Sequence, residues 1–124
     1  MRRVLVTGTG PVSRGAARSL RERGAEVVTW SRRGADLAGD LRDDAPFQGV
    51  DAARLTDIVH AAADTRFTID RATAQDGNVG GTRKALELAR RCPRLESFTL
   101  VSSLHAAGLA TGLVEEDALA RPPA

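Results

Sequence analysis

The residues best suited to do chemistry lie near the start of the chain, where glycines follow a short aliphatic run. Gly8 and Gly10 come directly after residues 3–7, and a stretch rich in Ala, Leu and Arg follows them. A glycine allows the chain to turn sharply there, and a second one lets a pyrophosphate approach the backbone. The N–H groups at the start of the next helix would face that anion. The pattern predicts a phosphate-binding turn formed by Gly8, Gly10, Pro11, Val12 and Ser13.

A ligand-free strand-to-helix turn is the alternative interpretation of these glycines, because short motifs of this kind also occur by chance. What favours the binding interpretation is the context of strand, glycine turn and helix, in that order.

A second candidate group follows the predicted strand of residues 26–31. An acidic residue at this point, about 20 residues beyond the glycine turn, binds the ribose hydroxyls of NAD. No Asp or Glu stands between Val27 and Gly34, whereas Arg32 and Arg33 do. Guanidinium groups suit a 2′-phosphate. The sequence therefore favours NADP(H) over NAD(H), with a solvated basic turn as the alternative.

These residues require a framework of alternating strands and helices. We expect strands at 3–7, 26–31, 56–61 and 97–102, and long helices at 12–23 and 72–91. A short third strand is expected within 35–41 and a short helix at 50–55. This alternation predicts an α/β fold of three layers, with a parallel sheet in the order 3-2-1-4-5. Residues 104–124 would form a less regular tail of a single domain spanning 1–124.

The bulk composition fits a small soluble protein. The chain has 124 residues, 42% of them hydrophobic and 27% charged, with a net charge of +2. The charges are interspersed, which argues against a nucleic-acid surface, and no apolar run is long enough to span a membrane. Residues 1–4 lead into a strand without a signal-peptide pattern. The single cysteine, Cys92, excludes an internal disulfide, fits a cytoplasmic location and is expected to serve in packing.

Five motifs, in the right order, resemble the extended short-chain dehydrogenase/reductase family. They are residues 4–8 with Gly10, 39–41, 58–63, 78–82 and 101–103. Residues 60–67, with 78–82 behind them, are most similar to the thioester-reductase and fatty-acyl reductase branch. The resemblance implies a Rossmann-like, doubly wound sheet of about five strands, truncated after the fifth. The glycine turn is one residue shorter than the family pattern, and Ser13 replaces the last glycine.

The resemblance also implies roles for residues elsewhere in the sequence. Asp40 and Leu41 match the pair that contacts the adenine, and Asn78 matches an asparagine that holds a helix and a strand end in register. His60 corresponds to a residue that is usually structural. Small side chains at the end of the fourth strand would leave room for the nicotinamide ribose, and these are Ala61, Ala62 and Ala63.

The acid/base residues of the family have no counterpart in this sequence. Hydride transfer in the family uses Tyr-x-x-x-Lys after the fifth strand, and the chain contains no tyrosine. Ser103 matches the active-site Ser or Thr that hydrogen-bonds a substrate carbonyl. The resemblance thus implies an oxidoreductase half that reduces carbonyls or thioesters only when a partner completes it.

Two other hypotheses stay open. One is a cofactor-binding module without chemistry. The other is a cofactor-independent cyclase or isomerase that uses Asp64, Ser103 and His105 as its acid/base set.

Association with another chain is expected from the fifth strand. Residues 97–102 are β-prone, with no Lys, Arg or Pro to discourage edge pairing. We expect a homodimer, or a complex with a second protein, through strand 97–102 or helix 72–91.

Overall fold

The structure, a computed structural model, describes residues 1–62 and 75–101. The expected tail and four of the candidate site residues lie outside these ranges, namely Ala63, Asp64, Ser103 and His105. Within the described helices, none is long and apolar enough to cross a bilayer.

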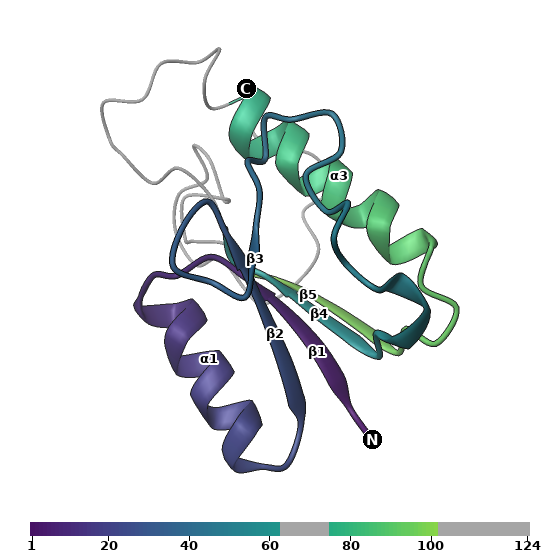
Figure 1. Ribbon diagram of the computed structural model, residues 1–124. Coiled ribbons are helices and arrows are strands. Elements are labelled where there is room, and N and C mark those ends of the chain that lie inside the picture. The colour runs from purple at the N-terminus through teal and green to yellow at the C-terminus, as the bar shows by residue number, and fades with distance from the viewer. Residues whose placement is uncertain (63–74, 102–124) are drawn as a thin grey trace, which may run out of the picture.

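A five-stranded parallel sheet forms the centre of the molecule (Figure 1). Its order is β3-β2-β1-β4-β5, as the sequence predicted. The parallel register sets Thr7 beside both Trp30 and His60, so the carboxyl ends of three strands meet at one edge. The strands are β1 (Arg3–Thr7), β2 (Glu26–Ser31), β3 (Leu37–Ala38), β4 (Asp57–His60) and β5 (Ser97–Leu100).

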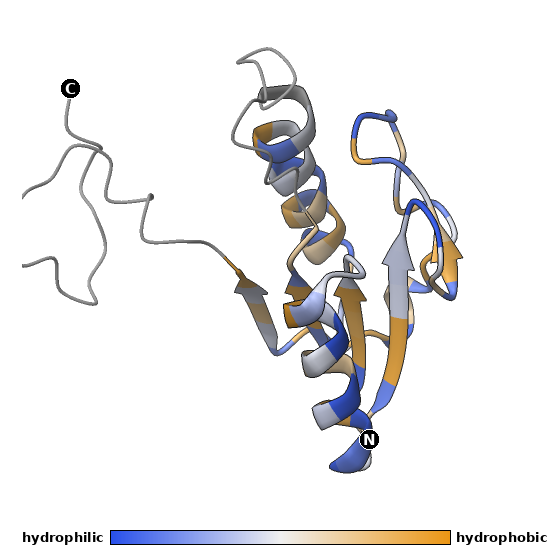
Figure 2. Cartoon of the chain, turned by 90° about the vertical axis from the view of Figure 1, so that its left-hand side faces the viewer, coloured by the Kyte–Doolittle hydropathy of each residue, from blue (hydrophilic) through white to orange (hydrophobic). Residues whose placement is uncertain are grey.

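Two helices lie on opposite faces of this sheet, which gives the expected three layers of a Rossmann-like fold (Figure 1). Helix α1 (Pro11–Glu22) connects β1 to β2, and α3 (Gly80–Arg90) precedes β5. A π-helical turn (Gln75–Val79) leads into α3, and a 3-10 turn (Ala52–Arg54) precedes β4. Seen from the side of α1, β5 has no described helix in front of it (Figure 2).

Most of the hydrophobic core lies on the α3 side. Leu5 and Ile58 from the central strands pack with Ala85 and Leu88 from α3. The remaining members come from β2, the β3–β4 connection and the end of α3, and are Trp30, Leu41, Phe47, Leu55 and Cys92. The sheet is therefore fixed to α3 by large apolar contacts, which form much of the hydrophobic stabilisation.

Two further contacts anchor the ends of this core. The indole Nε1 of Trp30 donates to the Pro46 carbonyl at 2.9 Å, and its ring lies 4.8 Å from that of Phe47. The Cys92 thiol donates to the Leu88 carbonyl at 3.2 Å, and burial raises the pKa of Cys92. Cys92 is thus a packing residue, as the sequence indicated.

The differences from the expected boundaries are small. Strands β1 and β2 match the predicted ranges, and α1 is shifted by one residue at each end because Pro11 occupies its first position. Strand β3 has only two residues, and the N–H of Gly39, which follows them, still bonds to the Ser31 carbonyl of β2 at 3.0 Å. Strands β4 and β5 are shorter than predicted.

Candidate nucleotide-binding site

The glycine turn after β1 is tightly packed against the end of β4. Gly8 has a φ of +96°, a conformation that side chains other than glycine rarely adopt. A Cβ at this position would lie 2.7 Å from Ser13 Oγ and 3.3 Å from the Ala62 nitrogen. The Gly8 N–H donates to the Trp30 carbonyl at 2.7 Å. Only glycine can therefore bring this turn so close to both β2 and β4.

Ser13 fixes the start of α1 to the end of β1. Its hydroxyl donates to the Thr7 carbonyl at 3.0 Å, and the residue is 4% exposed. This small, buried side chain, at the position of the last glycine of the family pattern, allows helix and strand to approach closely. Ser13 is thus a structural neighbour of Gly8.

The first turn of α1 has no side-chain cap. Gly10 is the N-cap, in an extended conformation, and no acidic residue lies in the first turn. Gly10, Pro11 and Val12 are all exposed. The N–H groups at the start of a helix have no acceptor inside it and carry the positive end of the helix dipole. The turn can therefore accept an anion such as a pyrophosphate, through the N–H groups of Val12 and Ser13.

Thr7 and His60 form a buried polar pair beneath this turn. Thr7 Oγ1 lies 2.8 Å from His60 Nδ1, and the N–H groups of Ala61 and Ala62 donate to the same oxygen, each at 3.0 Å. Burial lowers the pKa of His60 to about 4, so the imidazole is neutral at neutral pH. His60 thus has a structural setting, as the family resemblance implied.

The two candidate arginines extend from the end of β2. Arg32 and Arg33 are both exposed, and the neighbouring Ser31 hydroxyl lies 3.5 Å from that of Thr9 in the glycine turn. The next acidic residue along the sequence is Asp36, whose carboxylate accepts a hydrogen bond from the Thr29 N–H at 3.0 Å. The arginines therefore follow the residue that contacts the glycine turn. Asp36, the next acid along the chain, is engaged with β2, and the charge of Arg32 contributes to lowering the pKa of Asp40.

The neighbouring residues Asp40 and Leu41 have side chains in different environments. Arg42 donates to the Asp40 carboxylate through its side chain at 3.0 and 3.2 Å and through its backbone N–H at 3.0 Å. These bonds lower the pKa of Asp40 to about 2. Leu41 is 9% exposed and packs on α3. A Cβ added to Gly81 would lie 2.9 Å from Leu41 Cδ1. Asp40 thus stays near the surface, whereas Leu41 belongs to the core.

The structure brings together one part of the predicted site. Gly8, Ser13, Ala62 and the residues after β2 meet at the carboxyl ends of β1, β2 and β4. Asn78 lies apart from them in sequence, in the turn before α3, where its carbonyl accepts from the Thr82 hydroxyl at 2.9 Å. The sequence analysis did not identify Thr7, whose hydroxyl connects the ends of β1 and β4. A polar residue at the end of an otherwise apolar strand was a signal that could have revealed it.

A family match and several solved structures agree with this fold. Residues 43–123 match the family described as male sterility protein. The chain belongs to this family. The predicted resemblance to short-chain dehydrogenases/reductases of the fatty-acyl reductase type is confirmed. No curated protein sequence matches the chain significantly.

Three solved structures are similar to this member of the male sterility protein family. A short-chain dehydrogenase/reductase superfamily protein from Agrobacterium tumefaciens with bound NAD is 26% identical, with a TM-score of 0.74 over 86% of this chain and 34% of that one. MoeE5 in complex with UDP-glucose and NAD is 26% identical, with a TM-score of 0.76 over 97% and 42%.

The third is the terminal R domain from the myxalamid PKS-NRPS biosynthetic pathway. It is 20% identical, with a TM-score of 0.80 over 96% of this chain and 39% of that one, and shows the shared fold alone. The chain thus spans between 34% and 42% of the length of these three proteins.

Proposed function

We propose that the chain binds a nicotinamide dinucleotide across the carboxyl ends of β1, β2 and β4. The observation that carries the proposal is the glycine turn, with its positive-φ Gly8 packed against Ala62 and its uncapped first helical turn. Ligands of open parallel sheets bind at this edge, where the strand order reverses between β1 and β4. The NAD named for the Agrobacterium protein and for MoeE5 supports the same class of ligand.

Within that class we propose NADP(H) as the preferred cofactor. Arg32 and Arg33 are exposed and follow the residue that contacts the glycine turn, and guanidinium groups can pair with a 2′-phosphate through parallel hydrogen bonds. An acidic residue at this position would instead repel that phosphate. Asp36, the closest acid along the chain, is bonded to the Thr29 N–H and lies 3.7 Å from Arg21.

Titration of the purified chain with NADPH and with NADH, followed by nicotinamide fluorescence, tests both levels of the proposal. We expect tighter binding of NADPH, and loss of most of this preference in the Arg32→Ala/Arg33→Ala variant. Arg90→Ala/Arg91→Ala is the matched control, because these exposed arginines end α3. Equal affinity for both cofactors in the unaltered chain would contradict the preference, and binding of neither would contradict the site.

The chemistry we propose is reduction of a carbonyl or thioester in an assembly that supplies what this sequence lacks. Bound NADPH would supply a hydride to the carbonyl carbon, and a proton donor of the completing polypeptide would protonate the oxygen. An aldehyde or ketone would give an alcohol, whereas a thioester would then lose its thiol by cleavage of the C–S bond and leave an aldehyde. Because the chain contains no tyrosine, we expect negligible turnover by the chain alone. Oxidation of NADPH by the pure chain at rates unaffected by Ser103→Ala with His105→Ala would contradict this assignment.

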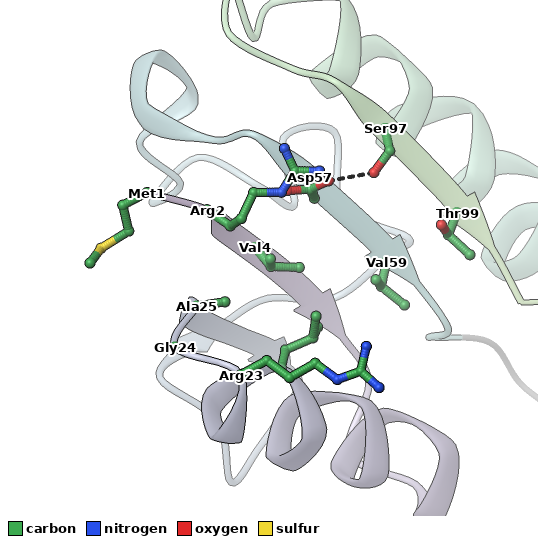
Figure 3. Close-up of a pocket in the computed structure, with 11 residues that line it drawn as sticks. Met1, Arg2, Val4, Arg23, Gly24, Ala25, Asp57, Val59, Ser97 and Thr99 are labelled. Carbon is green, nitrogen blue, oxygen red and sulfur yellow. Dashed lines mark hydrogen bonds and ion pairs between the residues drawn. The ribbon is translucent and has the colours of Figure 1, made fainter.

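We propose β5 as the surface for such an assembly. Within residues 1–62 and 75–101, β5 pairs with β4 alone, and Leu100 and Val101 are 50% and 38% exposed. A groove of about 530 Å³ lies beside β5 on the α1 side of the sheet, where Val4 and Val59 line it (Figure 3). An open, apolar strand edge of this kind favours pairing with another strand.

We propose a second copy of the chain as the partner at this edge. Antiparallel pairing about Thr99 would set no charged side chains opposite each other, since residues 97–101 carry no charge. Light scattering at micromolar concentration tests the proposal with Leu100→Lys, which should dissociate the dimer. Leu86→Lys, on the exposed side of α3, is the matched control for an interface through that helix. A monomer in the unaltered chain would contradict association through either surface.

The cyclase or isomerase hypothesis depends on Asp64, Ser103 and His105. These residues lie outside the described ranges, and nothing within those ranges favours a cofactor-independent reaction over dinucleotide binding.

A further inference from the structure

The Thr7 hydroxyl has three polar neighbours and a single proton. It lies 2.8 Å from His60 Nδ1 and 3.0 Å from each of the N–H groups of Ala61 and Ala62. Thr7 is fully buried and His60 is 1% exposed. In such a setting each polar group has to be satisfied by these neighbours, because an unpaired buried group is costly.

The roles of donor and acceptor in this cluster follow by elimination. A hydroxyl has two lone pairs and one proton, and a backbone N–H can only donate. The N–H groups of Ala61 and Ala62 therefore occupy both lone pairs of Thr7 Oγ1. The remaining proton has one direction left, toward His60, so Nδ1 must be the acceptor. The imidazole is consequently the tautomer that carries its hydrogen on Nε2.

This proton arrangement bears directly on the proposed cofactor site. The two N–H groups belong to the segment that leaves β4, and a Cβ on Gly8 would lie 3.3 Å from both the nitrogen and the Cα of Ala62. The Thr7 hydroxyl thus ties the end of β4 to the end of β1 directly below the glycine turn. If Nδ1 carried a hydrogen, the Thr7 oxygen would face three donors with only two lone pairs. One of its hydrogen bonds from the Ala61 and Ala62 N–H groups would then be lost.

We propose that His60 is a positioning residue of the dinucleotide site, which orients the Thr7 hydroxyl through Nδ1 and so holds the backbone of residues 61–62 against the glycine turn. The inference rests on the proposed function for its effect on cofactor binding. The tautomer itself is independent of that function.

Nitrogen-15 NMR of the labelled, unaltered chain tests the tautomer. We expect the His60 ring to show an unprotonated Nδ1 and a protonated Nε2 at neutral pH. His60→Asn removes the His60 signals and so separates them from those of His105. A protonated Nδ1, in either the other neutral tautomer or the cation, would overturn the inference.

Substitutions test the consequence for the site. Asn can offer its amide oxygen near the place of Nδ1, whereas Leu cannot, so His60→Asn should retain NADPH affinity and His60→Leu should lose it by about tenfold, the value of one buried hydrogen bond. In the same way Thr7→Ser should match the unaltered chain, and Thr7→Val should not. Equal NADPH affinities for His60→Asn and His60→Leu, both folded by circular dichroism, would overturn the positioning role.

Amide hydrogen exchange gives a readout that needs no cofactor. Exchange of the Ala61 and Ala62 amides should be slow in the unaltered chain and faster in His60→Leu than in His60→Asn. If the unaltered chain binds neither NADPH nor NADH, the proposed function fails, while the exchange rates and the tautomer still decide whether His60 orients Thr7. Uniformly fast exchange of both amides in the unaltered chain would refute the inference.

Discussion

The two ends of the parallel sheet are built from different chemistry. At the amino ends, charged side chains pair across strands, with Arg2 bonded to Asp57 at 3.1 Å and to Glu96 at 2.6 Å. Ser97 donates to the same Asp57 carboxylate at 2.5 Å (Figure 3). At the carboxyl ends the polar atoms are largely backbone groups, placed by Gly8 and by the Thr7 hydroxyl. The side chains at the amino ends bond mainly to one another, although the buried Arg3 Nε has no partner among the described residues, whereas the carboxyl ends present backbone donors to solvent.

This contrast separates stability from binding. Ion pairs and hydrogen bonds at the amino ends link β1, β4 and β5, so their loss should weaken the fold. The donors at the first turn of α1 have no partner within the helix and are suited to an anion. We therefore expect substitutions at the amino ends to change unfolding free energies and leave dinucleotide affinity unaltered. Substitutions at the glycine turn should change both.

The largest effect is expected at Gly8. Gly8→Ala and Gly24→Ala both force a side chain into a positive φ, of +96° and +89°, but a Cβ at Gly24 meets nothing within 4 Å. Strain alone should cost Gly24→Ala about 1–2 kcal/mol. Gly8→Ala should cost about 4 kcal/mol, because Ser13 and Ala62 must also move, and it should abolish NADPH binding. Urea unfolding measures both, and equal losses would contradict the packing argument.

Asp57→Ala should have the next largest effect. Its carboxylate accepts bonds from Ser97, from Thr56 Oγ1 at 2.7 Å and from Arg2, and the side chain is 11% exposed. We expect the unfolding free energy to fall by about 2–3 kcal/mol, as for loss of buried hydrogen bonds to a charged group. NADPH affinity should not change. Weaker NADPH binding at unaltered stability would show that the two ends are coupled.

A pH dependence should report the neutral state of His60. Burial lowers its pKa from 6.5 to about 4, so between these values the unfolded chain binds more protons than the folded one. Stability from this group is therefore present above pH 6.5 and lost as the pH falls toward 4. From pH 7.5 to 5 the loss should be about 2 kcal/mol. Urea unfolding at both pH values, compared with His60→Asn, measures it, and equal pH dependence of the two chains would contradict the burial effect.

The smallest effect is expected for Glu96→Gln. This carboxylate pairs with Arg2, but its side chain is 61% exposed. Pairs of this kind contribute little in water and are screened by salt. The unfolding free energy should fall by about 0.5 kcal/mol, and by less in 1 M salt. A loss as large as that of Asp57→Ala would mean that the amino ends act as one network.

Much of the fold could be predicted because its signals are local. The β-branched runs of β1 and β2 end at turns that contain glycine, so both strands have their predicted bounds. The third strand was harder to predict, since it has two residues and no run of its own. The expected helix of residues 72–91 contains a π-helical turn at Gln75–Val79, for which periodicity provides no signal.

The candidate site was predictable to a similar degree. Gly8, Gly10 and Ser13 form the expected turn, because strand, turn and helix follow one another directly in the chain. Leu41, in contrast, was matched to the adenine-contacting pair by the family resemblance alone. The structure packs it against Gly81, whose lack of a side chain creates the space, and its contact with an adenine stays a prediction. No local pattern could reveal that vacancy, since the two residues meet only when α3 lies on the sheet.

The sequence by itself determined the elements, their order and the conformations that glycine alone can adopt. These follow from the preferences of neighbouring residues and from the right-handed crossover of parallel strands. Only the tertiary structure decided which polar groups meet. Thr7 and His60 are 53 positions apart, and Arg2 and Asp57 are 55. Their contacts depend on the register of β1 beside β4, where a shift by one residue would turn every side chain to the other face.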